Sequence, residues 1–188
     1  MKPASGSHEE FERLAVPLLD ALYNFARWLS RDTNEAEDLV QETFAKALRG
    51  FASFEPGTDF RAWMFRILRN TFLTSRTGLQ AKLTVPIEPG DEESVGVTRE
   101  TPETLALASA TREALQAALE DLPIVYREVI LLCDVEEMKY QEIADVLGVP
   151  IGTVMSRVAR GRKLLRQALA DERAVSGMPG KPEERKRR

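Results

Sequence analysis

Residues 140–165, "YQEIADVLGVPIGTVMSRVARGRKLL", predict two helices joined by a tight glycine turn. In residues 140–148 the small and apolar side chains of Ile143, Ala144 and Leu147 recur at helical spacing and are expected to face inward. Gly148 permits the left-handed backbone that ends a helix. A second helix is expected to begin near Pro150, because proline is tolerated in the first helical turn. A short helix, a glycine turn and a second helix together predict a helix-turn-helix.

The second helix has two contrasting faces. One is expected to be buried and carries Ile151, Val154, Val158, Gly161 and Leu165. The opposite face carries Thr153, Ser156, Arg157, Arg160 and Lys163. Hydroxyl and guanidinium groups at such positions can reach base edges in the major groove. Arg162 and Arg166 lie to one side, where they are better placed for phosphates.

The charge of this helix is opposite to that of the chain. Residues 150–170 contain five cations and no carboxylate, whereas the 188-residue chain has 26 Lys+Arg against 30 Asp+Glu. A carboxylate here would repel a DNA duplex. The alternative is an ordinary solvated helix face, and we favour DNA recognition.

Composition limits the possible functions. A hydrophobic fraction of 43% and a charged fraction of 30% are those of an ordinary soluble protein. No signal peptide or membrane-spanning run is seen. The one cysteine, Cys133, indicates a reducing cytoplasm and is expected to pack in the core. Catalysis is poorly supported: His8 is the only histidine, and no phosphate loop, nucleophile elbow or metal-ligand set occurs. We therefore expect no enzyme activity, cofactor or metal.

Helical periodicity predicts an all-α chain of two small domains on a flexible linker. The N-terminal domain is expected over 11–76, the linker over 77–108 and the C-terminal domain over 109–171, with disordered ends at 1–10 and 172–188. Pro17 is expected to begin a helix or to separate it from a shorter one. Asn34 is the expected N-cap of the next helix, whose inward stripe is Leu39, Val40, Phe44, Ala47 and Leu48.

The third helix, expected over 59–76, combines cations with aromatic residues. Arg61, Arg66, Arg69 and Arg76 follow Asp59 with no further anion, and interleave with Phe54, Phe60, Trp63, Phe65 and Phe72. Cations and aromatic platforms are what single-stranded DNA binding requires. The alternative is that Trp63 and most of these aromatics form the core, with Trp63, Met64, Ile67 and Leu68 inward. Asn70 is costly if buried without a partner, and its amide can read a base edge.

Three segments, "AEDLVQETF", "FRAWMFRILRNTF" and "GVPIGTVMSR", resemble in this order the sigma-70 family of bacterial RNA polymerase sigma factors, in particular its extracytoplasmic-function (ECF) group. The resemblance implies core RNA polymerase and promoter DNA as partners. The N-terminal domain, which corresponds to the family's region 2, is implied to dock on the β′ clamp helices through Asp38, Gln41 and Glu42, with an apolar contact from Leu39. The C-terminal domain, which corresponds to its region 4, is implied to dock on the β flap. Without the resemblance, the helix that carries Asp38, Gln41 and Glu42 would be interpreted as an acidic helix exposed to solvent.

The resemblance also implies the DNA contacts. The loop from Phe54 to Phe60 and Asn70 would form a pocket for a base flipped from the −10 strand, with Arg61, Trp63 and Arg66 nearby. For the −35 element it points to Met155, Ser156, Ala159 and Arg160, whereas helical geometry favours Thr153, Ser156, Arg157 and Arg160. Ser156 and Arg160 are common to both sets, and Arg162 and Lys163 complete the predicted surface.

The linker is long enough for this function. Two DNA turns separate the elements by roughly 70 Å, whereas a free coil of about 32 residues spans roughly 30 Å and an extended one about 105–115 Å. The polymerase would hold it open, in a basic channel that suits the six linker carboxylates.

Besides an enzyme, two other functions are alternatives to a sigma factor. An independent helix-turn-helix regulator would need a dimerisation surface, and because no heptad seam is present we expect no homodimer. A sigma mimic that only titrates an anti-sigma protein would not need a cationic recognition helix. We also expect an anti-sigma partner, and the N-terminal motifs favour a zinc-binding, redox-sensing one.

Overall fold

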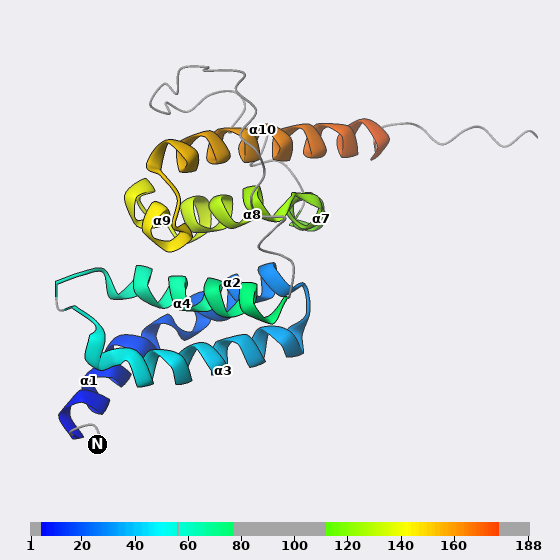
Figure 1. The fold of residues 1–188 in the computed structure, drawn as a ribbon. Coiled ribbons are helices and arrows are strands. Elements are labelled where there is room, and N and C mark those ends of the chain that lie inside the picture. The colour runs from blue at the N-terminus through cyan, green and yellow to red at the C-terminus, as the bar shows by residue number, and fades with distance from the viewer. Residues whose placement is uncertain (1–4, 56, 77–111, 177–188) are drawn as a thin grey trace, which may run out of the picture.

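The computed structural model describes residues 5–55, 57–76 and 112–176, and every regular element in these ranges is helical, as predicted (Figure 1). The N-terminal domain comprises α1 (Ser5–Ala15), η1 (Val16–Leu18), α2 (Leu19–Ser30), α3 (Thr33–Gly50), η2 (Phe51–Ser53) and α4 (Phe60–Ser75). The C-terminal domain comprises α7 (Arg112–Asp121), α8 (Ile124–Ile130), the π-helical turn η3 (Leu131–Val135), α9 (Tyr140–Leu147) and α10 (Ile151–Ser176). No helix in the described ranges is both long and apolar enough to cross a bilayer.

Local sequence sets the helix boundaries of the N-terminal domain. Pro17 lies in η1 and separates α1 from α2, as expected. The N-cap of α3 is Asp32, whose side chain accepts a hydrogen bond of 2.9 Å from the Glu35 amide. The prediction of Asn34 as the cap is therefore wrong by two residues, since Asn34 already lies inside the helix. Asp59 caps α4 by accepting from the Ala62 amide at 3.0 Å.

The expected disorder at the N-terminus is wrong for residues 5–10, which belong to α1. This helix is anchored by Phe11, which is buried and meets Phe51 edge-on with ring centroids 5.4 Å apart. His8 also lies in α1, where it pairs with Glu12. Residues 1–4 lie outside the described ranges.

The C-terminal domain contains the predicted helix-turn-helix. Gly148 has a φ of 66° and ends α9 in the left-handed conformation. Val154, Val158 and Leu165 of α10 are buried as expected, but Ile151 is 45% exposed, because it lies in the first turn before the helix reaches the core. The expected linker lies outside the described ranges. α10 continues through residues 172–176, where disorder was predicted.

The two domains pack against each other, a relationship that the sequence did not predict. Figure 1 shows α4 of the lower layer alongside α8 and α9 of the upper layer. One continuous core cluster includes Met64 and Leu68 of α4 together with Ile143 and Leu147 of α9. The indole of Trp28 packs against the small core formed by α7, α8 and α10. The cationic side of α4 is therefore not entirely open to solvent.

Candidate nucleic-acid interface

The predicted −35 surface of α10 is partly exposed. Ser156, Ala159 and Lys163 are exposed, and Thr153, Met155 and Arg160 are partly exposed. Arg157 differs, because its side chain is only 14% exposed and its Nη1 lies 3.8 Å from Glu128 Oε1. The exposed part of the face is thus centred on Ser156, Ala159 and Lys163, and Arg157 is turned toward α8.

Arg162 and Cys133 form a polar cluster beside this helix. Arg162 pairs with Asp134, and Arg162 Nη2 lies 3.6 Å from Cys133 Sγ. The hydrogen bond to Asp134 raises the pKa of Arg162 above its usual value. Cys133 is half-buried rather than fully in the core. Burial and then the nearby Asp134 carboxylate raise its pKa to about 11, against the opposing effect of Arg162.

Phe54 and Phe60 line a pocket at the start of α4, with a volume of about 410 Å³. Their ring centroids are 5.2 Å apart, and Trp63 lies 5.3 Å from Phe54 and 5.6 Å from Phe60. This volume falls in the range of roughly 300–1,000 Å³ typical of ligand pockets. The other lining residues are Glu10, Arg13, Leu14, Phe51, Ala52, Gly57 and Thr58.

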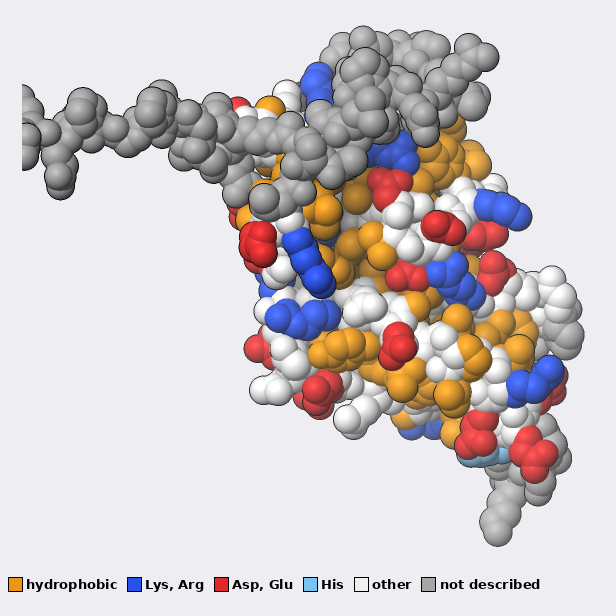
Figure 2. All heavy atoms as spheres, turned by 180° about the vertical axis from the view of Figure 1, so that it is seen from behind, with side chains coloured by type: hydrophobic (Ala, Val, Ile, Leu, Met, Phe, Trp, Pro, Cys, Tyr) orange, Lys and Arg blue, Asp and Glu red, His pale blue; other side chains and the backbone are white. Residues whose placement is uncertain are grey.

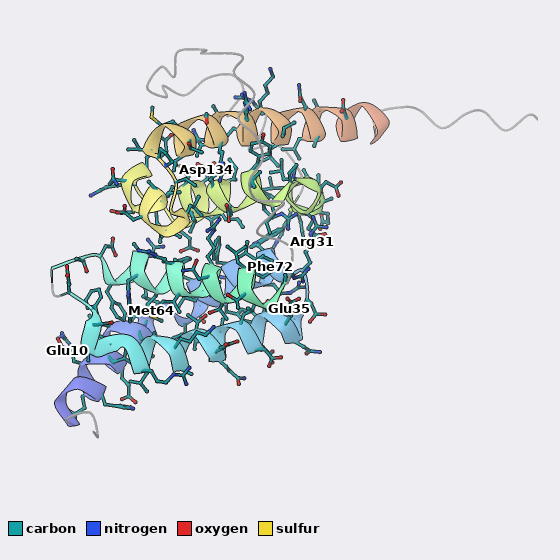
Figure 3. All side chains as sticks on the ribbon, viewed as in Figure 1. Glu10, Arg31, Glu35, Met64, Phe72 and Asp134 are labelled. Atoms are coloured by element: carbon teal, nitrogen blue, oxygen red, sulfur yellow. The ribbon has the colours of Figure 1, made fainter. Side chains whose placement is uncertain are left out.

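The polar wall contributed by α1 was missed, because residues 1–10 were expected to be disordered. Glu10 and Arg13 line the pocket from α1, and Figure 3 shows Glu10 at the end of the bundle where the loop before α4 lies. Asn70 does not line it. Asn70 is exposed ten residues after Phe60, about 15 Å further along α4 at 1.5 Å per residue.

The cations of α4 have different environments. Arg66 is exposed. Arg61 pairs with Glu136, and Arg69 is buried against Glu128. Arg76 pairs with Glu35 of α3, with Nη2 and Oε2 2.6 Å apart. Arg66 is thus the exposed member of this set that makes no ion pair within residues 5–55, 57–76 and 112–176.

Two of the aromatic residues proposed as stacking platforms are core residues instead. Phe65 and Phe72 are both at most 1% exposed, and Phe65 packs against Phe25 with centroids 5.3 Å apart. Figure 3 shows Phe72 on α4 at the other end of the helix from the pocket. Trp63 is only partly buried. Of the five aromatic residues predicted as stacking platforms, Phe54, Phe60 and Trp63 therefore keep exposed surface.

Three of the four α3 residues predicted to bind polymerase are exposed, and the fourth is not. Asp38, Gln41 and Glu42 are exposed, and Glu42 pairs with Lys46 at 2.8 Å. Leu39 is 3% exposed and belongs to the core cluster. Its expected apolar contact with the polymerase is therefore wrong, because its side chain is already packed within the domain.

No single-sign patch covers the face drawn in Figure 2, where acidic and basic side chains are interspersed with hydrophobic ones. Within the described ranges, no group of histidine, cysteine and acidic residues has the arrangement of a metal site. Three features of the described residues are candidates for binding a partner: the exposed face of α10, the pocket before α4 and the acidic face of α3.

Both domains match families of known proteins. Residues 14–81 match the family model described as Sigma-70 region 2, and residues 112–165 match Sigma-70, region 4. The chain is 40% identical over 151 residues to the ECF RNA polymerase sigma factor SigE of Mycolicibacterium smegmatis, a match that covers 80% of this chain but 58% of that relative. It is 36% identical to EcfG of Rhodopseudomonas palustris, over 80% of this chain and 78% of that protein.

Solved structures show the same similarity. The sigma factor RpoE of Bartonella quintana, in complex with the anti-sigma factor NepR, is 33% identical with a TM-score of 0.66, covering 86% of this chain and 98% of that one. CnrH in complex with the cytosolic domain of CnrY is 30% identical with a TM-score of 0.62, covering 89% and 92%. The chain belongs to the ECF RNA polymerase sigma factors of the sigma-70 family.

Proposed function

We propose that this chain binds core RNA polymerase and directs it to promoters, reading a −35 element with α10 and capturing the −10 strand beside α4. The observation that carries the proposal is the order of two family regions, residues 14–81 and 112–165, over domains that present an acidic helix face, an aromatic pocket and a cationic recognition helix. The chain acts in the cytoplasm as an initiation factor and performs no covalent chemistry itself.

In this proposal the pocket before α4 receives a base flipped from the −10 strand. Phe54, Phe60 and Trp63 offer aromatic surface, and Arg66 offers an exposed cation for the strand backbone. Extruding a base costs a few kcal/mol, which strand contacts would offset. Since Asn70 does not line this pocket, its proposed contact is with a neighbouring nucleotide rather than with the captured base.

On α10, Ser156 and Arg160 are the proposed base contacts, and Met155, Ala159 and Thr153 complete the groove-facing surface. Lys163 and Arg162 are placed for phosphates at its edge. Polymerase contacts are assigned to Asp38, Gln41 and Glu42 on the clamp side, and to the C-terminal domain on the β flap. An anti-sigma factor is a further proposed partner, because both solved relatives above are sigma factors in complex with anti-sigma factors.

Co-purification with core RNA polymerase tests the proposal. Gln41→Lys and Glu42→Lys reverse the charge pattern of an exposed face, so binding should fall while circular dichroism stays unchanged. Asp20→Lys, an exposed change on α2, is the matched control and should bind normally. If both α3 variants co-purify with core RNA polymerase as well as the control does, the assignment of this α3 face to polymerase binding is contradicted. Failure of the unmodified chain to bind core polymerase would contradict the proposed function.

A further inference from the structure

The C-terminal domain covers the cationic side of α4 at its first turns. Arg61 Nη1 donates a 2.7 Å hydrogen bond to the backbone oxygen of Glu136, and the Arg61 guanidinium also pairs with the Glu136 carboxylate. Glu136 directly follows η3, and its side chain is 8% exposed. A cation assigned to the −10 strand is therefore held by a carboxylate of the other domain.

Two turns further along α4, Arg69 makes a second and more deeply buried contact. Arg69 Nε donates to Glu128 Oε2 at 2.8 Å and Nη2 to Oε1 at 3.2 Å, while Nη1 donates to the Leu147 backbone oxygen at 3.2 Å. The side chains of Arg69 and Glu128 are 9% and 2% exposed. The same carboxylate lies 3.8 Å from Arg157 of α10, so Glu128 links the arginines of both DNA-binding helices.

A third contact joins the domains through Arg127, which directly precedes Glu128 in α8. Arg127 Nη1 donates to the Trp28 backbone oxygen at 3.0 Å, and its Nη2 donates to the backbone oxygens of Glu120 and Leu122. Burial and then the nearby positive charge of Arg31 lower the pKa of Arg127 to about 10, against the opposing effect of Glu120 and Asp121. The three arginine contacts lie along one interface and tie α2 and α4 to α8 and the α8–α9 turn.

These contacts are suited to a reversible closure. A buried ion pair adds little net stability, because desolvation offsets much of the attraction, although removal of one partner is costly. A DNA phosphate offers an arginine the same kind of bidentate acceptor as a carboxylate. Separation of the domains would return Glu128 and Glu136 to water and free Arg61 and Arg69 for a phosphate backbone.

The two DNA-binding surfaces are not covered equally. Ser156, Ala159 and Lys163 of α10 remain exposed in the closed arrangement, whereas Arg61 and Arg69 of α4 are occupied. A closed chain can therefore present its −35 face to a duplex while Arg61 and Arg69 are unavailable to a DNA strand, although the pocket before α4 and Arg66 stay open.

We propose that α8, η3 and the turn to α9 form an internal cover for α4, in which Glu136 and Glu128 occupy the arginines that bind single-stranded DNA once the domains separate. That Arg61 and Arg69 contact the DNA strand is part of this inference, and it rests on the proposed function, which places the −10 strand beside α4. The closure itself does not depend on the proposed function, because it is defined by contacts within the chain.

Single-molecule energy transfer on the full chain tests the closure without DNA. Dyes are placed at Ala45→Cys and Gln167→Cys, two exposed positions on different domains, in a Cys133→Ser background. Glu136→Arg and Arg61→Glu should each convert a high-transfer population to low transfer, and the double variant should restore high transfer. Glu137→Arg is the matched control, because Glu137 is the exposed neighbour and undergoes the same charge change. A Glu136→Arg distribution identical to that of Glu137→Arg would overturn the closure.

A binding measurement then tests the cover. The probe is a fluorescein-labelled single-stranded 12-nucleotide DNA of random sequence. Glu136→Arg should bind it at least fivefold more tightly than Glu137→Arg, although both variants carry the same net charge. If energy transfer shows that the Glu136→Arg chain is open, but its affinity for the DNA equals that of Glu137→Arg, the masking of α4 is overturned. Failure of the proposed function would appear differently, as absence of promoter-dependent transcription with an unchanged transfer distribution.

Discussion

Arg69 of α4 and Glu128 of α8 form a two-pronged ion pair in the buried interface between the two domains, with Nε–Oε2 and Nη2–Oε1 separations of 2.8 and 3.2 Å. Burial raises the pKa of Glu128, and Arg69 and then Arg157 oppose that rise. The carboxylate therefore depends on its arginine partners for its charge.

Arg69→Met is expected to destabilise the closed chain strongly, because Glu128 is left buried with only Arg157 nearby. Removal of one partner of a buried pair typically costs about 3–5 kcal/mol. The double variant Arg69→Met/Glu128→Met should recover part of the loss, since no unpaired carboxylate remains. Urea denaturation measures both. A double variant as unstable as the single one would show that the two side chains are not coupled.

Gly161 lets α10 approach α8 closely, and its substitution should destabilise the C-terminal domain. A Cβ at Gly161 would lie 3.0 Å from Ile130 Cγ1 and 3.4 Å from Tyr126 Cβ. Ile130 is buried, so it cannot move aside freely. Overpacking costs about 1–3 kcal/mol, against a helix-propensity gain of about 1 kcal/mol. Gly161→Ala should therefore lower the unfolding free energy by on the order of 1 kcal/mol.

Gly152→Ala is the matched control in the same helix. A Cβ there would meet nothing within 4 Å, and the residue is exposed. Its stability in the same urea titration should be unchanged or higher by up to about 1 kcal/mol. If Gly161→Ala is as stable as Gly152→Ala, the close contact between α8 and α10 does not restrict position 161.

Arg160 is expected to read a base, and Arg162 to contact phosphate. A bidentate arginine–guanine contact discriminates by about 1–3 kcal/mol, so Arg160→Ala should relax preference at one −35 position by that amount. Arg162→Ala should instead weaken binding to all sequences and reduce the salt slope by about one. Promoter activity over all single-base −35 variants distinguishes them. A base-specific loss for Arg162→Ala would mean that α10 is rotated about its axis relative to this assignment.

Cys133 should react slowly with alkylating reagents, because the thiolate is the reactive form. Its pKa of about 11 in the folded chain leaves roughly two orders of magnitude less thiolate at pH 8 than an ordinary cysteine of pKa about 8.5 has. The iodoacetamide rate should rise about tenfold per pH unit from pH 7 to 10, whereas the urea-unfolded chain should level off near pH 9. A plateau below pH 9.5 in the folded chain would contradict the raised pKa.

Local signals in the sequence were enough for most of the fold. Gly148, Pro17 and Asp59 each fix a helix boundary through backbone chemistry that acts within a few residues. α1 was missed because residues 5–10 are polar and the helix is anchored mainly through Phe11, which packs against a distant ring at Phe51. Leu39 was already placed inward by periodicity, and only the family resemblance suggested that it faced a partner.

Long-range pairing explains what the sequence could not predict about the site. Arg69 and Glu128 are 59 residues apart, and a cation that binds DNA cannot be distinguished by sequence from one that pairs with a remote carboxylate. The same holds for Arg61 and Glu136, which are 75 residues apart. The pocket wall from Glu10 and Arg13 likewise depends on α1 packing beside the loop before α4.

Transcription in vitro with core RNA polymerase on fragmented genomic DNA from the source organism, followed by sequencing of the RNA 5′ ends, tests the central claim most directly. The sigma-factor assignment predicts start sites that appear only when the chain is added. These should share two upstream motifs about two DNA turns apart, and Arg160→Ala should change base preference in the upstream motif alone. A chain that binds core polymerase yet yields the same 5′ ends as core enzyme alone would contradict the assignment.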